Sequence, residues 1–273
     1  MIDVTALGEI LIDFTPCGKS ESGQRIFEQN PGGAPANVLA CLNKCGKKTA
    51  FIGKVGNDMH GQFLVDVLND SEICTDGVVV DDSAFTTLAF VALSDSGERS
   101  FSFARKPGAD TCLRQDELKE ELIRDSKEVA IEGMRSVISY VDVMKISDEE
   151  TALLTDIVDP EGAAKKLVDM GVSIVAVTLG VAGALVCTKE GVAVVLGYKA
   201  NMVDTTGAGD SFWGGFLNCL LESGKRPSEV SLDEAARFAK YGNAVASLCV
   251  EKRGAIPAMP TIEEIQGRLN GKS

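Results

Sequence analysis

The stretch DTTGAGDSF, residues 204–212, places two glycines and a carboxylate directly before an expected helix. Beyond it, Phe212, Phe216 and Leu220 recur at helical spacing, and Gly224 is a typical stop signal. Glycines let the backbone turn sharply and leave its N–H groups uncovered. Because such N–H groups and the positive end of a helix dipole both favour an anion, the stretch predicts a phosphate site.

Asp210 lies inside this expected phosphate site. A phosphate would repel a carboxylate at this place, so the presence of Asp210 suggests a chemical role. The carboxylate is placed to take a proton from a hydroxyl that attacks the phosphoryl group. The pattern therefore indicates a small-molecule kinase. An ordinary helix cap is the alternative, because Asp and Thr often precede helices and Gly turns are common.

The composition fits a cytoplasmic enzyme with small-molecule partners. The chain has 273 residues, of which 45% are apolar, enough for a single α/β domain over residues 1–273. A net charge of −13 argues against binding of nucleic acid or anionic membranes. Asp3, Glu9 and Asp13 stand where a signal peptide would be basic, and no apolar run is long enough to span a membrane.

The sequence argues against other kinds of site. The eight cysteines form no CxxC pair and His60 is the sole histidine, which disfavours zinc. Cys41 and Cys45 are either a thiol pair or, as we expect, small apolar fillers. The tripeptide Gly18-Lys19-Ser20 lacks the leading glycine of a P-loop, and no GxGxxG follows the first strand.

Apolar patterning predicts alternating strands and helices, typical of a doubly wound, mostly parallel sheet flanked by helices. The first elements expected are a strand at 4–12 ending at Asp13, a Gly-rich stretch to residue 33, a helix starting near Pro35, a strand at 49–55 and a helix after Asn57-Asp58. Strands at 78–80, 86–93 and 99–105 follow, and residues 116–139 read as helix. Strands at 141–146 and 173–178 and a helix at 232–249 complete the pattern.

Two stretches together resemble the signatures of the ribokinase-like (PfkB) sugar-kinase family. DTTGAGDSF is similar to its C-terminal signature, and Gly-Gly-Ala-Pro-Ala-Asn at 32–37 to its N-terminal one. The resemblance implies a ribokinase-like α/β fold with a small β lid, formed by about 14–32 and 84–105. From pattern alone, the hairpin at 86–105 can equally be an edge of the main sheet. The resemblance also implies ATP-dependent transfer, with Asp210 as base and the N–H groups of Gly207, Ala208 and Gly209 as charge stabilisers.

On the sugar side, the resemblance implies that Asp13, Gly33 and Asn37 hydrogen-bond the acceptor's hydroxyls. A carboxylate can accept from two neighbouring hydroxyls, and an amide can both donate and accept. Arg105 is expected to face either sugar or phosphate. A strand-end cap at Asp13 and a first-turn polar residue at Asn37 are the structural alternatives.

On the nucleotide side, the resemblance implies that the loop with Thr178, Gly180 and Gly183 lies against ribose and phosphates, and that Asn243 touches the adenine side. A turn between two strands explains the GxxG pattern equally well. Glu150 is expected to help hold Mg²⁺ through water, although with Ser147 it also matches a capping box.

The region of Asp204 and Thr206 resembles the family's site for a monovalent cation, commonly K⁺. After Lys127 the family pattern is interrupted, because a strand, a helix and a substrate-binding strand end are missing. Either these residues are deleted, or the segment is disordered and absent from the sequence at hand. We favour the second explanation, because losing central strands exposes edges of a parallel sheet.

Within the family, the segments 8–16, 32–42, 142–150 and 253–261 are most similar to fructokinases. The resemblance therefore implies transfer of the γ-phosphoryl group of ATP to the primary hydroxyl of fructose. 2-Keto-3-deoxygluconate kinase and ribokinase are the alternatives, and a non-catalytic sugar-binding relative is a further one. An exposed lid hairpin can also pair with its twin in a homodimer, as in several relatives.

Overall fold

The computed structural model describes residues 2–93, 99–124, 126–131, 138 and 141–271. The chain divides into two compact units, which we describe separately. The first comprises Met1–Glu132 and Gly254–Ile256, and the second comprises Gly133–Arg253 and Pro257–Ser273.

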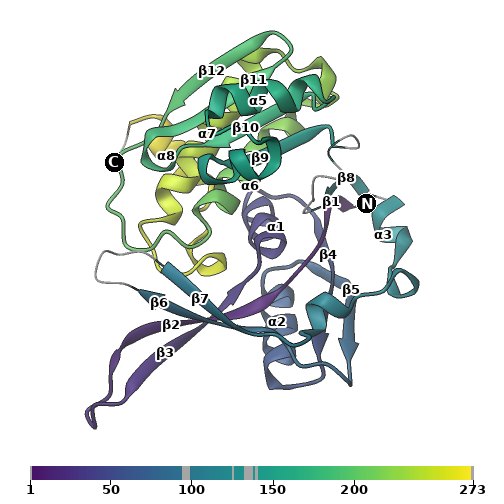
Figure 1. Cartoon of the computed structure of the whole chain (residues 1–273), viewed down its shortest axis with the longest axis vertical. Helices are drawn as coiled ribbons and strands as arrows, with labels where there is room; N and C mark the ends of the chain where they lie inside the picture. The colour runs from purple at the N-terminus through teal and green to yellow at the C-terminus, as the bar shows by residue number, and fades with distance from the viewer. Residues whose placement is uncertain (1, 94–98, 125, 132–137, 139–140, 272–273) are drawn as a thin grey trace. The chain divides into compact units, whose positions relative to one another are not determined.

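A four-stranded parallel sheet forms the centre of the first unit (Figure 1). Its order is β5-β4-β1-β8, with β1 at Ile2–Leu7, β4 at Thr49–Gly56, β5 at Cys74–Asp81 and β8 at Ser126–Ile131. Every residue of β4 is buried, as expected for an inner strand of a parallel sheet. Helix α1 (Ala34–Lys44) packs against β1 and β4, and α2 (Met59–Asp70) packs against β4 and β5.

A second sheet of the first unit has the order β3-β2-β6-β7 (Figure 1). Its strands are β2 (Leu11–Lys19), β3 (Arg25–Gly32), β6 (Leu88–Leu93) and β7 (Arg99–Ala104). β2 and β3 form one antiparallel hairpin, β6 and β7 form another, and β2 runs parallel to β6. The hairpin predicted at 86–105 is therefore confirmed, and it belongs to a sheet separate from the parallel one. Its turn, residues 94–98, lies outside the described residues.

The strand predicted at 4–12 was wrong in its extent, because two strands occupy this region. β1 ends at Leu7 and β2 begins at Leu11, and they lie in different sheets. A Cβ atom on Gly8 would lie 2.6 Å from Cγ of Pro35, so the glycine permits a bend against the start of α1. Asp13 is consequently the third residue of β2 rather than the end of a strand, and most of 14–32 is a paired hairpin.

The helix predicted at 116–139 was also wrong over the described residues. A single 3₁₀ turn at Gln115–Glu117 and a short helix α3 at Glu120–Arg124 are followed by the strand β8. β8 pairs in parallel with β1, which would otherwise be the edge of the sheet. Pairing with a neighbouring strand has outweighed the local preference for helix.

The sheet of the second unit has the order β12-β11-β10-β9 (Figure 1). β9 (Val143–Ser147) and β10 (Ile174–Thr178) are parallel. β11 (Gly183–Thr188) runs antiparallel to β10, and β12 (Gly191–Leu196) runs antiparallel to β11. Helix α5 (Pro160–Asp169) packs on the face that carries Val175 and Val177. The remaining helices are α4 (Thr151–Thr155), α6 (Ala208–Ser223), α7 (Leu232–Cys249) and α8 (Ile262–Leu269), and α7 contacts β11, β12, α6 and α8.

The interruption of the family pattern falls between β8 and β9. The residue numbering runs without a break through this connection. The choice between a deletion and a disordered segment stays a prediction. Residues 132–137 and 139–140 of this connection lie outside the described part of the structure.

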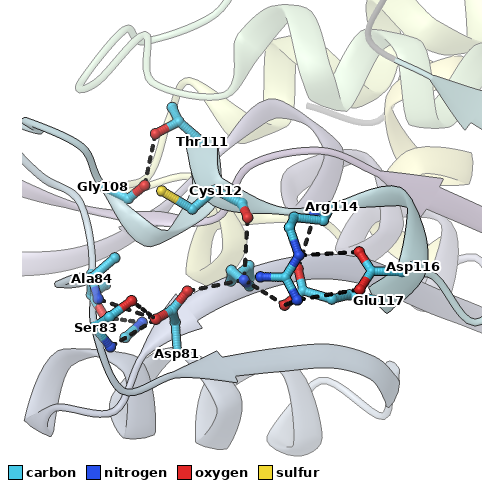
Figure 2. A network of polar contacts seen from close by, with 12 residues as sticks. Asp81, Ser83, Ala84, Gly108, Thr111, Cys112, Arg114, Asp116 and Glu117 are labelled. Carbon is cyan, nitrogen blue, oxygen red and sulfur yellow. Dashed lines mark hydrogen bonds and ion pairs between the residues drawn. The ribbon is translucent and has the colours of Figure 1, made fainter.

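Lys54, in β4, is 2% exposed although it is charged. Its ammonium donates to Oδ2 of Asp81 at 2.9 Å, to Oε1 of Glu117 at 2.8 Å and to the carbonyl of Cys112 at 3.2 Å. Figure 2 shows these acceptors converging from separate parts of the chain. Because three acceptors satisfy the three donors of the ammonium, the network fastens residues 112–117 to the parallel sheet.

The groups of this network shift one another's pKa. Burial alone would lower the pKa of Lys54, but its hydrogen bonds to Glu117 and Asp81 outweigh burial and raise it. The hydroxyl of Ser83, followed by Lys54, lowers the pKa of Asp81. The hydrogen bond from Lys54 is also the main cause that lowers the pKa of Glu117. All three groups therefore carry charge at neutral pH.

Candidate active site

The turn before α6 places Asp210 in the first turn of the helix, as the sequence predicts. Gly207 precedes the helix with a φ of 74°, in the left-handed region that favours glycine. Asp210 is the third helical residue and is half-buried, so its carboxyl group is not sealed in the interior. Gly224 ends the helix with a φ of 63°, which confirms the predicted stop.

The N–H groups at the start of α6 differ in their availability. Ser211 N donates to the carbonyl of Gly207 at 2.8 Å, and Ala208 N donates to the carbonyl of Thr205 at 3.2 Å. Over the described residues, no protein group accepts the N–H of Gly207 or Gly209. Of the three predicted donors, two are thus open to an anion, and the N–H of Ala208 already has an acceptor.

Thr178 is the last residue of β10 and pairs with Ser147, the last residue of β9. The chain then turns through Gly180, at a φ of 55°, and Gly183, at a φ of 109°. A Cβ atom on Gly183 would lie 2.2 Å from the carbonyl oxygen of Val195, so only glycine fits there. The segment is a tight turn between two strands, and its contact with a nucleotide stays a prediction.

Two other residues predicted on this side make structural hydrogen bonds. Nδ2 of Asn243, a residue that is 6% exposed, donates to the carbonyls of Val195 and Leu196 at 3.0 and 3.2 Å. Oε2 of Glu150 accepts from the backbone N and Oγ of Ser147 at 2.7 and 2.9 Å, forming the capping box. Their roles toward adenine and Mg²⁺ stay predictions.

Asp204 and Thr206 lie in the segment that leads into α6. Oδ1 of Asp204 accepts from N and Oγ1 of Thr206 at 2.9 and 2.7 Å. The backbone N groups of Val203 and Asp204 both donate to the carbonyl of Val250, at 2.8 and 3.1 Å. These bonds tie the segment to the end of α7, and a cation beside it stays a prediction.

The residues predicted to bind sugar all belong to the first unit. The half-buried Asp13 turns its carboxylate toward Gly32, where a Cβ atom would lie 2.3 Å from Oδ2. Gly33, at a φ of 115°, precedes α1, and a Cβ there would lie 2.5 Å from the carbonyl oxygen of Glu9. Asn37, in the first turn of α1, is 4% exposed and donates its N–H to the carbonyl of Gly33 at 3.0 Å. The two glycines thus let β3, β2 and α1 approach closely.

Arg105, directly after β7, is held by a buried carboxylate. Its guanidinium forms an ion pair with Asp110, whose side chain is fully buried, while the arginine side chain is 33% exposed. Thr87 donates its hydroxyl to the same carboxylate at 2.5 Å. The ladder Ile12–Leu88–Ala104 places Arg105 at the same end of the sheet as Asp13.

Sequence reasoning missed three residues that shape these sites. Gly32 makes room for Asp13, Asp110 holds Arg105, and Lys145 places its ammonium beside Gly209. A charged residue inside the otherwise apolar run Val143–Ile146 was the available signal for Lys145. The contacts of Gly32 and Asp110 depend on strand pairing, which the sequence does not display.

Comparison with known proteins decides the family to which the chain belongs. A family model described as pfkB family carbohydrate kinase matches residues 1–136 and 121–262. The chain belongs to the pfkB family. Curated pfkB relatives include probable fructokinase-5 of Arabidopsis thaliana, 36% identical over 320 aligned positions that cover 99% of this chain and 98% of the relative. Fructokinase-2 of Oryza sativa subsp. japonica is 35% identical, with 96% and 92% covered.

Solved structures of two fructokinases share the fold. Fructokinase from Vibrio cholerae O395, bound to fructose, ADP and calcium, has a TM-score of 0.86 at 27% identity and covers 98% of this chain and 99% of that one. Fructokinase from Xylella fastidiosa with bound ATP has a TM-score of 0.86 at 26% identity, with 99% and 98% covered. The predicted ribokinase-like fold and the predicted carbohydrate-kinase class are therefore confirmed. No described helix of this pfkB kinase is long and apolar enough to cross a membrane.

Proposed function

We propose that this chain phosphorylates fructose, transferring the γ-phosphoryl group of ATP to the primary hydroxyl and giving fructose 6-phosphate. The observation that carries the proposal is the half-buried carboxylate of Asp210 in the first turn of α6, next to the N–H groups of Gly207 and Gly209. Fructose as acceptor is supported by near full-length relatives named fructokinase and by the Vibrio cholerae enzyme that holds fructose and ADP.

In the proposed reaction, Asp210 accepts the proton of the attacking hydroxyl. The hydroxyl oxygen forms a bond to the γ-phosphorus while the bond from that phosphorus to the β-phosphate oxygen breaks. The N–H groups of Gly207 and Gly209 stabilise charge on the phosphoryl oxygens during this transfer. Sugar phosphate and ADP leave, and Asp210 returns its proton to solvent.

We propose that the sugar hydroxyls contact Asp13, Gly33, Asn37 and Arg105, and that the nucleotide lies along Thr178, Gly180, Gly183 and Asn243. The ion pair with Asp110 supports this role for Arg105, because it fixes the guanidinium while leaving part of it exposed.

We also propose the use of metal ions, in keeping with the calcium and potassium ions named for the Vibrio cholerae fructokinase structures. Glu150 fits a water-mediated contact, because it is exposed and its capping box engages only Oε2. In the described part of the chain, no cluster of three or more His, Cys, Asp or Glu side chains could hold an ion by itself. Mg²⁺ bound with ATP supplies neutralisation of phosphate charge. We propose that a monovalent cation binds near Asp204 and Thr206.

A second candidate function is that of a non-catalytic sugar- or nucleotide-binding relative. The alignment with probable fructokinase-5 has 320 positions and this chain has 273 residues, so at least 47 of those positions have no residue here. The two ranges matched by the family model overlap at residues 121–136, beside the interruption expected after Lys127. The retained Asp210 and its neighbouring N–H donors favour an active enzyme.

The two candidates are separated by an assay for ADP release with ATP, Mg²⁺ and a panel of fructose, ribose, 2-keto-3-deoxygluconate and nucleosides. We expect turnover with fructose above all other acceptors. Turnover with another sugar alone would correct the acceptor. Binding of sugar and nucleotide without any ADP release would establish the non-catalytic alternative.

Replacing Gly32 by Ala is expected to weaken sugar binding without affecting ATP. The new Cβ atom would lie 2.3 Å from Oδ2 of Asp13 and displace the carboxylate. Loss of hydrogen bonds to a charged group predicts a rise of about 10- to 100-fold in KM for fructose. Gly162→Ala in α5, where the nearest atom is 3.1 Å from the new Cβ, is the control. Equal KM values for Gly32→Ala and the wild type would remove Asp13 from the sugar site.

We further propose that the chain forms a homodimer through the sheet β3-β2-β6-β7. Phe101 and Phe103 of β7 are each 49% exposed, and Ile26 of β3 is 42% exposed. Light scattering after size exclusion tests this, with Phe103→Ser expected to shift a dimer toward monomer.

A cytoplasmic location remains a prediction, since one relative is named chloroplastic.

A further inference from the structure

Lys145 lies in β9, at the edge of the second unit's described sheet, and the reaction described above gives it no role. Side chains alternate along β9, and Met144 and Ile146 pack into the apolar cluster that includes Leu167 of α5. The side chain of Lys145 therefore points to the opposite face of the sheet. Its backbone pairs with Ala176 of β10. The lysine is only partly exposed, so bulk water does not fully solvate its side chain.

The side chain of Lys145 reaches the start of α6. A Cβ atom placed on Gly209 would lie 3.0 Å from Nζ and 3.6 Å from Cε of the lysine. Glycine at this position thus leaves the room that the lysine uses. The ammonium lies next to the helical turn whose N–H groups at Gly207 and Gly209 have no protein acceptor among the described residues.

Two positive groups therefore meet at one place. The N-terminus of α6 carries the positive end of the helix dipole, and the ammonium of Lys145 repels it. Over the described residues, the ammonium of Lys145 makes no hydrogen bond or ion pair, whereas that of Lys54 has three acceptors and that of Lys166 donates to the carbonyl of Thr155 at 2.7 Å. An anion bound to both groups would turn the repulsion into attraction.

We propose that Lys145 is a catalytic residue that binds the γ-phosphoryl group during its transfer. This inference rests on the proposed function and adds a charged donor to the backbone donors at Gly207 and Gly209. As the hydroxyl oxygen bonds to phosphorus and the bond to the β-phosphate oxygen breaks, the ammonium donates hydrogen bonds to non-bridging oxygens. The hydroxyl proton goes to Asp210, and Lys145 keeps its own protons throughout.

The kinetic test compares Lys145→Met, which removes the charge, with Lys145→Arg, which retains it. We expect kcat/KM for ATP to fall about 10- to 100-fold in Lys145→Met, while KM for fructose changes less than about twofold. Lys145→Arg should recover part of the loss. Lys189→Met, in the exposed turn between β11 and β12, is the matched control and should behave as wild type. Wild-type kcat/KM in Lys145→Met would overturn the proposal.

A binding test separates this inference from the proposed function. Calorimetry with the β,γ-imido analogue of ATP should give at least about tenfold weaker binding to Lys145→Met, with adenosine binding unchanged. Equal weakening of adenosine, or a matching loss of thermal stability, would assign Lys145 a structural role and overturn the inference. If the wild type phosphorylates no sugar yet binds the analogue in a Lys145-dependent way, the proposed function fails, and of the inference only the contact between Lys145 and the γ-phosphoryl group stands. If the wild type binds no nucleotide, both fail.

Discussion

Asp210→Asn is expected to lower turnover by about 10²- to 10⁴-fold, the usual contribution of a positioned general base. The amide has nearly the shape of the carboxylate, so the helix turn of α6 and both substrate sites should persist. An amide does not accept a proton at neutral pH, so the attacking hydroxyl loses its base. Turnover is measured as ADP release under saturating ATP and fructose, and ligand affinities by calorimetry.

The same exchange at Asp233 is the matched control. Asp233 is an exposed aspartate in the first turn of α7, so it shares the helix-end setting of Asp210. Asp233→Asn should retain wild-type turnover. More than about a tenth of wild-type turnover in Asp210→Asn would contradict the role of base. Loss of ligand affinity in Asp210→Asn would instead indicate that the site had collapsed.

Lys54→Met is expected to lower the free energy of unfolding by about 3 to 5 kcal/mol, because removing one partner of a buried ionic network leaves the others uncompensated. The carboxylates of Asp81 and Glu117 then face each other without the ammonium that joins them. Urea unfolding followed by circular dichroism measures the effect. Lys165→Met is the control, because Lys165 is 56% exposed and pairs with Glu161 at the surface. Equal unfolding midpoints for both variants would show that the network adds no stability.

The pH dependence of this effect has a definite sign. The lowered pKa values of Asp81 and Glu117 mean that their contribution is present above the ordinary values of 3.8 and 4.5 and is lost as the pH falls through the lowered ones. The raised pKa of Lys54 means that its contribution is present below 10.5 and is lost as the pH rises through the raised one. The difference between wild type and Lys54→Met should therefore be largest near neutral pH and shrink in acid.

Local patterns were sufficient for much of the fold. The helix predicted at 232–249 has the bounds of α7, because Ser231 and Glu234 cap its start and a long apolar face follows. The strand predicted at 173–178 corresponds to β10, and the start of α6 was also predicted from its local pattern. The errors fell where long-range contacts decide the structure. β8 is a strand because β1 offers it an edge, and the break between β1 and β2 depends on the contact of Gly8 with α1.

The residues of the candidate site likewise divide into those set by local sequence and those set by long-range contacts. Gly207, Gly209 and Asp210 could be predicted because the helix start, the glycines and the carboxylate follow one another in the chain. Lys145 could not, because it reaches Gly209 from a strand more than sixty residues earlier in the sequence. Strand pairing and the facing of β9 bring the two together. The sequence does, however, place a lone positive charge in an apolar strand, which indicates that the charge has a partner elsewhere in the fold or in a ligand.

The β2–β6 ladder has a consequence for the sugar site proposed around Asp13 and Arg105. β2 is bonded to β3 on one edge and to β6 on the other, and β6 continues into β7. Asp13 lies in this hydrogen-bonded sheet and Arg105 directly follows its last strand. The two hairpins cannot bend relative to each other without breaking the β2–β6 backbone pairs from Ile12 to Phe14. The two proposed sugar contacts would therefore keep their spacing when the sheet moves as a whole.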